Sequence, residues 1–305
     1  MKSKFPCLAL FCGFLLAFLS ANPVHHPHVQ AQEAASGSSR QGPPAGPRAQ
    51  KRALTIEDQF RIERVGSPQV SPDGSRIAYT VGTTDYDTNS SETRIWLVDR
   101  DGGDPVPMTG KGSSASSPRW SPDGRHLSFL SARKDDKAQV WVLDLVNGGE
   151  ARQLTEVDEG VSDYEWAPNG KRLVLVLHDP KPEKDPAPKT RSGADIPEPW
   201  VIDRLQFKQD YAGYLDRRRD HLYTWDLGTG TLVQITSGDF DDSQPVWSPD
   251  GETIAFVSNR SENPDDNFDT NIWLVDADNT DMGAHLVQVT TNPGPDSSPV
   301  WSPDG

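Results

Sequence analysis

A five-residue phrase recurs along the chain and constrains its fold more than any other feature. The copies read VSPDG, WSPDG, WAPNG, WSPDG and WSPDG, and the residues before their last glycines stand at positions 73, 123, 169, 250 and 304. The spacings are therefore 50, 46, 81 and 54 residues, and three of the four lie near 50. A sequence period of this length is typical of proteins that stack one supersecondary unit on the next.

The phrase has the composition of a tight turn between two strands. Pro presets φ at the first central position, Ser and Asp bond to the local backbone, and Gly accepts the left-handed conformation that reverses the chain. The Trp before the turn is expected to end one strand and to pack its ring in the core. Segments that alternate in strand fashion follow the first four copies, namely RIAYTV, HLSFLS, RLVLVL and TIAFVS.

Each unit continues with a third strand that ends in Asp and a short fourth strand that ends in Thr. The third strands are expected at 94–99, 139–144, 221–226 and 271–276, and the fourth at 105–109, 151–155, 232–236 and 286–290. Four short strands in about 50 residues form a propeller blade, which buries its faces by stacking on the next blade. We therefore predict an all-β protein, a β-propeller with four-stranded antiparallel blades. A β-sandwich has no reason to repeat one pentapeptide in register.

The predicted blades start near residues 67, 117, 163, 244 and 298, which gives about four complete blades and the start of a fifth. Propellers close as rings of typically four to eight blades. We therefore expect 53–305 to be a partial propeller, an incomplete ring within a longer protein. The spacing of 81 residues predicts an insertion at 178–220, between the second and third strands of the third blade. Long insertions in compact folds tend to form functional rims or partner contacts.

The N-terminal residues have the pattern of an export signal. Lys2 and Lys4 precede an apolar run from Phe5 to Ala21, so we predict a signal peptide at 1–21, with an uncleaved membrane anchor as the alternative. Residues 22–52 are rich in Ser, Gly and Pro and are expected to form a flexible linker. The protein would be periplasmic or extracellular, and it would contact a membrane only if the leader is not cleaved. Both cysteines, Cys7 and Cys12, lie in the leader.

The net charge and the side-chain clusters limit which partners, cofactors and metal sites the sequence predicts. The formal net charge of −15 argues against nucleic acid as a partner, because phosphate backbones attract an excess of Lys and Arg. No pattern predicts a cofactor site. The histidines are expected to be packed or exposed rather than metal-bound: His25, His26 and His28 in the linker, and His126, His178, His221 and His285 in the propeller.

Two further clusters each have two readings. Arg217, Arg218 and Arg219 form either a salt-linked loop or a rim that binds a peptide carboxylate. Oxygen side chains between 265 and 276 resemble a calcium loop, although the glycine and the final glutamate of such a loop are replaced. A solvated acidic hairpin loop is the other reading. These oxygen ligands would be Asp265, Asn267, Asp269, Asn271 and Asp276.

Three stretches resemble the N-terminal propeller of the prolyl oligopeptidase family of serine peptidases, and within it the acylaminoacyl-peptidase and dipeptidyl-aminopeptidase-like branch. They are LTIEDQFRIERVGSPQVSPDGSRIAYTV (54–81), the WSPDG repeats, and PWVIDRLQFKQDYAGYLDRRRDHLYTWDLGTG (199–230). The resemblance covers 53–305. It implies a propeller over the active site of an α/β-hydrolase domain that carries Ser, Asp and His, where it restricts access to short or unfolded peptides.

The chain departs from that family in one respect. It contains no Gly-x-Ser-x-Gly nucleophile elbow, so no catalytic, cofactor-binding or metal-binding residue is assigned, and the chain alone is expected to be inactive. The function implied is the substrate-gating portion of an exported aminopeptidase or oligopeptidase whose hydrolase domain is missing from this chain. The alternative is a periplasmic TolB-like propeller that binds other proteins.

Overall fold

The computed structural model describes residues 52–181, 189–192, 201–210 and 213–305. The chain divides at residue 54, and its second unit, Leu54–Gly305, is compact. All helices and strands of the described residues lie in the second unit. The predicted signal peptide, the linker up to residue 51 and parts of the insertion lie outside the described residues and stay predictions.

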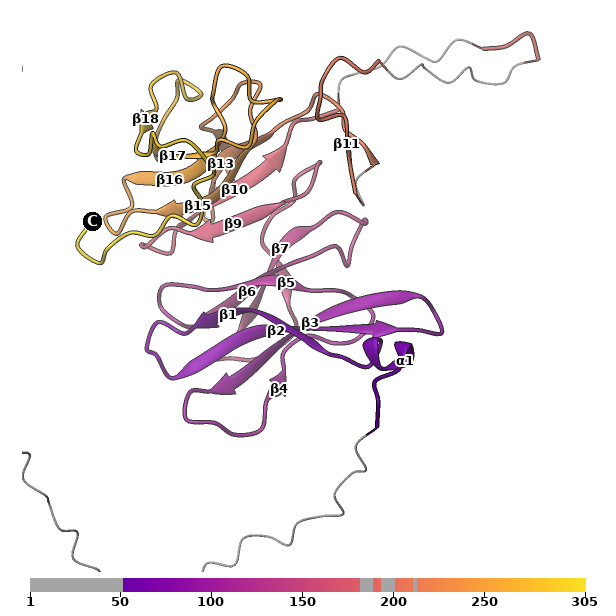
Figure 1. The fold of residues 1–305 in the computed structure, drawn as a ribbon. Coiled ribbons are helices and arrows are strands. Elements are labelled where there is room, and N and C mark those ends of the chain that lie inside the picture. Colours follow the sequence, from indigo (N-terminus) through magenta and orange to yellow (C-terminus); the bar gives the residue numbers. More distant parts are fainter. Residues whose placement is uncertain (1–51, 182–188, 193–200, 211–212) are drawn as a thin grey trace, which may run out of the picture. The chain divides into compact units, whose positions relative to one another are not determined.

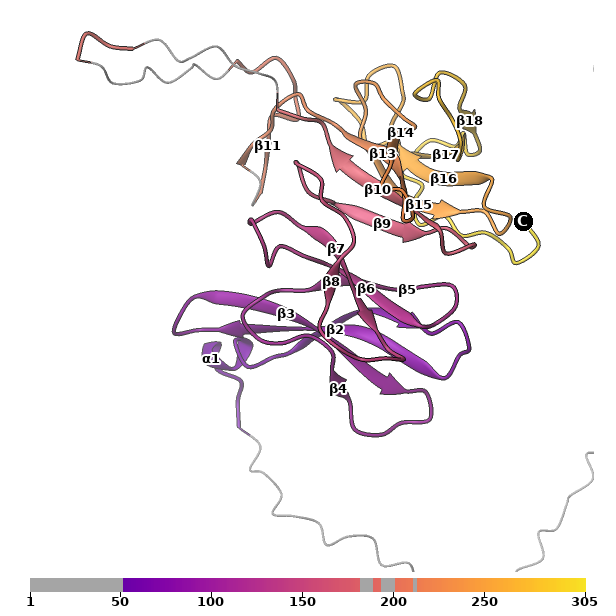
Figure 2. The same ribbon diagram turned by 180° about the vertical axis from the view of Figure 1, so that it is seen from behind.

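Four antiparallel sheets of four strands follow one another along the second unit (Figures 1 and 2). Each sheet is a blade in which the chain passes from one strand to its neighbour. The first blade holds β1 (Arg64–Val70), β2 (Arg76–Asp85), β3 (Ser90–Asp99) and β4 (Val106–Pro107), and the second β5 (Ser116–Trp120), β6 (His126–Ser131), β7 (Gln139–Asp144) and β8 (Arg152–Gln153). The third holds β9 (Asp163–Trp166), β10 (Arg172–His178), β13 (Asp220–Asp226) and β14 (Leu232–Gln234), and the fourth β15 (Asp242–Trp247), β16 (Thr253–Ser258), β17 (Asn271–Asp276) and β18 (Val287–Gln288).

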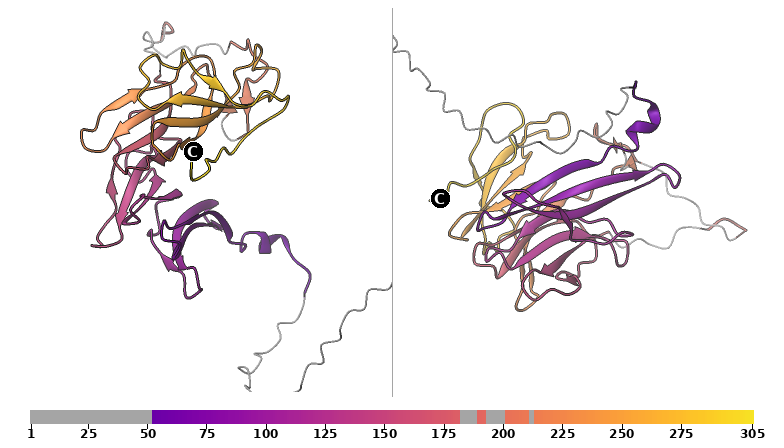
Figure 3. Two further views of the ribbon diagram at one scale, coloured as in Figure 1. Left: turned by 90° about the vertical axis from the view of Figure 1, so that its left-hand side faces the viewer. Right: turned by 90° about the horizontal axis from the view of Figure 1, so that it is seen from below.

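The blades are joined through their first strands, since β1 contacts β5, β5 contacts β9 and β9 contacts β15. One apolar cluster lies between each pair of successive blades. The largest side chains of these clusters are Phe129 and Trp120 at the first seam, Tyr164 and Trp166 at the second, and Phe256 and Trp247 at the third. No cluster of the described residues joins the first blade to the fourth. The predicted β-propeller with an incomplete ring is therefore confirmed, and Figure 3 shows the blades from the side and from below.

The repeated phrase forms the turn between the first and second strands of each blade. In the first blade, Ser71 Oγ donates to Asp73 Oδ1 at 2.6 Å and accepts from the Arg76 N–H at 2.9 Å. The Gly74 N–H donates to the Ser71 carbonyl, and Gly74 has φ of +70°, a conformation that side chains with a Cβ adopt rarely. The second and fourth blades repeat these bonds at Ser121 and Ser248.

In the second, third and fourth blades, the tryptophan of the phrase fastens the blade to the one before it. Trp120 Nε1 donates to the Gln69 carbonyl of the first blade at 3.0 Å, and the guanidinium of Arg76 lies 5.4 Å from the centroid of its ring. Trp247 repeats both contacts with Glu165 and Arg172 of the third blade. The sequence predicts a packed ring at this position, and the structure adds a hydrogen bond across the seam.

The third blade differs from the other three because no proline stands two residues before the first residue of its phrase. In the first, second and fourth blades, the residue before this proline has a positive φ and the first strand contains a bulge. In the third blade β9 pairs with β10 without a register shift, and Tyr164 takes the place of the proline. Its hydroxyl oxygen lies within hydrogen-bond distance of two groups of the second blade, the Ser117 carbonyl at 3.0 Å and Ser128 Oγ at 2.9 Å.

Two short elements were not expected from the sequence. Helix α1 (Ile56–Gln59) precedes the first blade, where the Thr55 N–H donates to Asp58 Oδ2 at 2.9 Å in a capping box. The hairpin of β11 (Lys208–Gln209) and β12 (Gly213–Tyr214) lies within the insertion. Both elements are too short for hydrophobic periodicity to mark them in a sequence.

The turn aspartates predict a loss of stability in acid. Hydrogen bonds from the Ser71 hydroxyl, the Ser75 N–H and the Ser75 hydroxyl lower the pKa of Asp73 to about 2, from an ordinary value of 3.8. The Ser121 and Ser248 hydroxyls lower the pKa of Asp123 and Asp250 in the same way. A carboxyl whose folded pKa is depressed stabilises the fold above its unfolded pKa, and this contribution is lost as the pH falls through the folded pKa.

The free energy of unfolding, measured by urea titration between pH 7 and pH 2, is therefore expected to fall most steeply below about pH 4. The triple variant Asp73→Asn, Asp123→Asn, Asp250→Asn is expected to be less stable at pH 7 and to lose less stability between pH 4 and pH 2. Equal losses in the two proteins over that range would show that these turns contribute nothing to the acid dependence.

Candidate functional site

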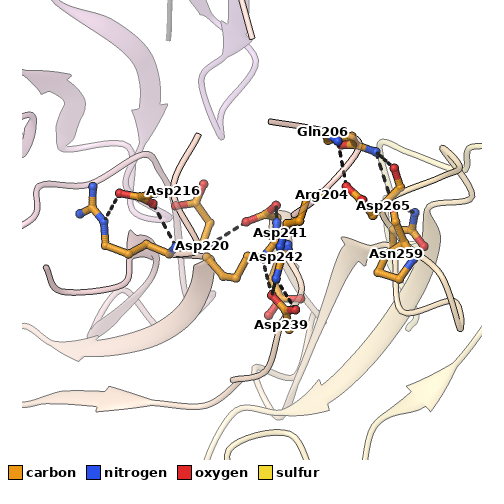
Figure 4. Close-up of polar contacts among 12 residues, drawn as sticks. Arg204, Gln206, Asp216, Asp220, Asp239, Asp241, Asp242, Asn259 and Asp265 are labelled. Atoms are coloured by element: carbon orange, nitrogen blue, oxygen red, sulfur yellow. Dashed lines mark hydrogen bonds and ion pairs between the residues drawn. The ribbon is translucent and has the colours of Figure 1, made fainter. Parts of the chain in front are cut away.

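The insertion and the fourth blade enclose a charged recess of about 290 Å³. Arg204, Gln206 and Asp216 come from the insertion, Asp239 and Asp241 from the segment between β14 and β15, and Asn259 and Asp265 from the loop between β16 and β17 (Figure 4). The 178–220 insertion leaves the sheet after His178, where β10 ends, and returns at Asp220, where β13 begins. The first and last residues of the insertion therefore lie beside one another in the β10–β13 ladder.

A larger recess of about 490 Å³ lies between the second and third blades, at the repeated turns. It is lined by turn residues such as Pro122 and Pro168. The turns of the two blades stack closely here, because the Pro122 side chain lies 3.8 Å from the position that a Cβ atom on Gly170 would take. This recess therefore results from the stacking of successive turns. The recess at the insertion is the better functional candidate, because charged groups from segments far apart in the sequence converge there.

The arginines of LDRRRDH fasten the end of the insertion. Arg219 Nε lies 2.9 Å from Asp239 Oδ1, and its Nη1 lies 2.8 Å from Asp241 Oδ2. Arg218 bridges Glu159 and Asp216 at 3.0 and 2.7 Å. Of the two readings of this cluster, the salt-linked loop is the one seen in the structure. Arg217 also has a carboxylate partner, Asp203.

The part of the insertion around Leu205 is bound by the loop between β16 and β17 of the fourth blade. Asp265 accepts hydrogen bonds from the backbone N–H groups of Leu205 and Gln206, at 2.5 and 2.9 Å. Arg204 Nη2 donates to Asp239 Oδ1 at 2.7 Å (Figure 4). The insertion is thus tied both to its own blade and to the next one.

The oxygen side chains between 265 and 276 serve as loop acceptors. Asp269 Oδ1 accepts from the Gly294 N–H at 2.8 Å, Asn267 Oδ1 from the Asp269 N–H at 2.9 Å, and Asp276 Oδ1 from the Asp278 N–H at 2.8 Å. The last residues, from Asn271, belong to β17. No group of three or more His, Cys, Asp or Glu side chains is placed to hold a metal ion within the described part of the chain. In this structure the oxygens of Asn267, Asp269 and Asp276 act as acceptors for backbone N–H groups.

A buried ion pair lies beneath the recess and was not expected from the sequence. Asp242 is completely buried, and both of its carboxylate oxygens accept from Arg260 Nη2, at 2.8 and 3.0 Å. His221 Nδ1 lies 3.4 Å from Asp242 Oδ2, and its Nε2 lies 3.7 Å from Asp179 Oδ1. His221 is buried, so the prediction that it is a packed side chain agrees with its position.

The other propeller histidines lie apart from one another. His178 Nδ1 lies 2.8 Å from Asp220 Oδ1, and His285 Nδ1 lies 2.6 Å from Asp281 Oδ2. His126 begins β6 and is half-buried. His25, His26 and His28 lie outside the described residues. Among the described residues, no hydrogen bond joins a histidine ring to a serine hydroxyl, and the turn serines Ser71, Ser121 and Ser248 are bonded to aspartate.

Comparison with known proteins identifies the repeat. Residues 56–185 match the family model PD40, described as a TolB beta propeller domain. This stretch of the chain is a PD40 propeller domain. Outside this stretch, the WSPDG turn at 247–251 and the contact of its tryptophan with the preceding blade recur in the fourth blade.

The relatives of this PD40 propeller are peptidases. The chain is 33% identical over 226 residues to the uncharacterized peptidase YuxL of Bacillus subtilis, and 26% identical over 280 residues to dipeptidyl-peptidase 5 of Porphyromonas endodontalis. These matches cover 74% and 87% of this chain but only 34% and 39% of the two relatives. The resemblance to the propeller of prolyl-oligopeptidase-type peptidases is confirmed.

A solved structure has the same fold. Acylaminoacyl peptidase of Pyrococcus horikoshii superposes with a TM-score of 0.54 at 18% identity, over 76% of this chain and 33% of that protein. The chain therefore spans about a third of the length of the peptidases it matches. No helix in the described part of the chain is long and apolar enough to cross a membrane.

The ion pairs predict how firmly the insertion is held. Removing the guanidinium of Arg219 deletes two ion pairs, with Asp239 and Asp241, and pairs with such largely exposed carboxylates are worth up to about 1 kcal/mol each. Hydrogen exchange at the Leu205 and Gln206 amides of the Arg219→Gln variant is expected to be about tenfold faster. Arg100→Gln, at an exposed pair in the first blade, is the matched control. Unchanged exchange in Arg219→Gln would mean that the insertion is held by other contacts.

Proposed function

We propose that this chain is the substrate-gating propeller portion of an exported serine peptidase of the aminopeptidase or oligopeptidase type. The observation that carries the proposal is the match between these repeats and the propeller-containing part of peptidase relatives, which extends over 74% and 87% of the chain. In this proposal the chemistry belongs to an α/β-hydrolase domain that is not among these 305 residues. Its serine, activated by a histidine, would form an acyl-enzyme with the peptide substrate.

The recess at the insertion supports the gating part of the proposal. Long loops on a rigid scaffold commonly carry binding functions, and here the scaffold is the third and fourth blades. The insertion is bound at several points by arginine–carboxylate pairs, so it can form a firm rim. A firm rim beside a propeller passage would admit extended peptides and exclude folded proteins.

The proposed export rests on the leader at 1–21. If the leader is cleaved, the mature protein begins near Asn22, and residues 22–305 contain no cysteine. Mass spectrometry of the protein recovered from the periplasm or the medium is expected to give a mass that lacks the first 21 residues. A cytosolic protein of full mass would refute export without affecting the peptidase assignment.

The function is tested first by assay. The 305-residue chain is expected to release no product from aminoacyl or peptidyl chromogenic substrates, because it contains no nucleophile elbow. Turnover that is abolished by a serine-directed phosphonate would contradict the proposal. The DNA after codon 305 provides the second test, and a strand, a Gly-x-Ser-x-Gly turn and a helix encoded there would support a peptidase.

The family model favours one second candidate. Because PD40 is described as a TolB beta propeller domain, a propeller that acts by binding other proteins is the alternative. Two or three further blades followed by a stop codon would support this binding module, whereas an encoded hydrolase domain would exclude it.

A further inference from the structure

The guanidinium of Arg133, in the second blade, is held by a serine and two aromatic rings. Arg133 stands two residues after the end of β6, and its Nε donates to Ser131 Oγ at 3.3 Å. Its Cζ lies 5.0 Å from the centroid of the Phe129 ring and 4.9 Å from that of the Trp141 ring. The Trp141 ring is itself fixed, because its Nε1 donates to the Ser131 carbonyl at 3.1 Å. These contacts hold the donors of Arg133 in one orientation.

This guanidinium has no counter-charge. No carboxylate in the described part of the chain pairs with Arg133, and the nearby Asp135 pairs with Lys134. Burial lowers the pKa of Arg133, as expected for a cation that leaves water without an anion beside it. Its Nη1 and Nη2 bond to no described group and are not among the buried atoms, so both are open to a ligand.

The fourth blade shows what an arginine at this position binds. Arg260 stands two residues after the end of β16, as Arg133 does after β6. Its guanidinium also lies against aromatic rings, 5.0 Å from Phe240 and 5.7 Å from Phe256. Its Nη2 donates to both oxygens of Asp242, at 2.8 and 3.0 Å. The ligand of this arginine is therefore a carboxylate.

The second blade keeps the arginine of this pair but not the aspartate. Ala115 stands five residues before Trp120, as Asp242 stands five residues before Trp247. Ala115 is completely buried, and its methyl side chain has no atom that accepts a hydrogen bond. The repeat therefore places an arginine at 133 without the carboxylate that satisfies it in the fourth blade.

We propose that Arg133 binds the C-terminal carboxylate of a peptide, which interacts with it as Asp242 does with Arg260. The planar guanidinium has two outward donors that match the two oxygens of a carboxylate. Every peptide with a free C-terminus carries this group whatever its sequence, so a gate that admits many peptides can recognise it. The proposal rests on the proposed function for the class of ligand, and on the repeat geometry for the site.

Arg133 lies at the face of the propeller from which the insertion emerges. It follows the second strand of its blade, and the insertion leaves the third blade at the end of β10, which is also a second strand. Each second strand begins at a copy of the repeated turn, so their far ends lie at one face. A peptide bound at Arg133 would therefore lie on the face that carries the candidate rim.

Titration of the 305-residue chain with N-acetyl-trialanine tests the proposal, with the Trp141 indole N–H signal in a ¹H–¹⁵N spectrum as the readout. The free acid is expected to shift this signal, and the C-terminal amide to bind at least about tenfold more weakly, because it lacks the charge. Arg133→Gln is expected to weaken binding of the free acid by a similar factor. Arg133→Lys should restore little, because lysine lacks the planar fork.

Two further variants separate the site from the general charge of the protein. Arg100→Gln removes a positive charge at an exposed pair in the first blade and is expected to bind the free acid as the original chain does. Ala115→Asp supplies within the chain the carboxylate found in the fourth blade, so it is expected to occupy Arg133 and to weaken binding at least about tenfold. Arg133→Gln decides the matter if the buried aspartate prevents folding.

Equal binding of the free acid and the amide, or unchanged binding by Arg133→Gln or by folded Ala115→Asp, would overturn the proposal. So would an amidated peptide with a glutamate side chain that binds as tightly as the free acid, because the site would then not select the peptide end. None of these readouts depends on hydrolysis. The peptidase assignment, which the DNA after codon 305 tests, would therefore stand or fall separately.

Discussion

Trp120→Ala is expected to lower the free energy of unfolding by about 3–5 kcal/mol, the cost of replacing a buried aromatic side chain by a methyl group. The Trp120 ring is 8% exposed and lies in the cluster between the first and second blades. The substitution also removes the donor to the Gln69 carbonyl and the ring beneath Arg76. Loss of this side chain therefore weakens the seam in three ways at once.

Urea unfolding followed by circular dichroism measures the effect. Trp120→Phe keeps an aromatic ring but not the indole N–H, so its loss is expected to be clearly smaller than that of Trp120→Ala. Val300→Ala, at a side chain that is 88% exposed, is the control and is expected to change stability by less than about 0.5 kcal/mol. Similar values for Trp120→Ala and Val300→Ala would contradict the seam described above.

Arg119→Met is expected to cost about 3 kcal/mol at pH 7.5, because it leaves two carboxylates of the third blade without a counter-charge. Arg119 Nε lies 2.9 Å from Glu165 Oε2, and its Nη2 lies 3.7 Å from Asp163 Oδ1. Burial raises the pKa of both carboxyls, and Arg119 opposes this rise. Without Arg119 the folded state favours the protonated carboxyls even more strongly.

The sign of the pH dependence follows from these raised pKa values. Between the ordinary pKa of a carboxyl and its raised folded pKa, the folded state binds more protons than the unfolded state, so stability falls as the pH rises through that window. The cost of Arg119→Met is therefore expected to be smaller at pH 5 than at pH 7.5. Addition of Glu165→Gln to Arg119→Met is expected to recover part of the loss at pH 7.5. A pH-independent cost would show that Arg119 acts by packing alone.

Blade number and strand order could be predicted because each blade contains one copy of the repeated phrase, between its first and second strands. The phrase at 70–74, 120–124, 166–170 and 247–251 marks a turn whose bonds are local, between residues at most five apart. The insertion was visible as an interrupted period. The fourth strands are shorter than expected, for example Arg152–Gln153 within 151–155, because the Thr155 hydroxyl accepts the Val140 N–H in place of a ladder bond.

The site could not be predicted in the same way, because its contacts are distant in the sequence. Asp265 meets the Leu205 and Gln206 amides about 60 residues away, and Arg218 meets Glu159. The side chains around Asp265 resembled metal ligands only because loop acceptors and calcium ligands are the same residue types. The buried aspartate Asp242 had one signal in the sequence, since an Asp stands five residues before the Trp in both 242–247 and 296–301.

In the propeller, successive Trp-led turns join successive blades around one axis, and nuclear Overhauser spectroscopy of the tryptophan indole protons tests this arrangement. We expect cross-peaks from the Trp120 indole N–H to backbone protons at Gln69 and Val70, and from the Trp247 indole N–H to those at Glu165 and Trp166. Indole protons that instead show cross-peaks only within their own repeat, as independent hairpins or a sandwich would give, would contradict the propeller.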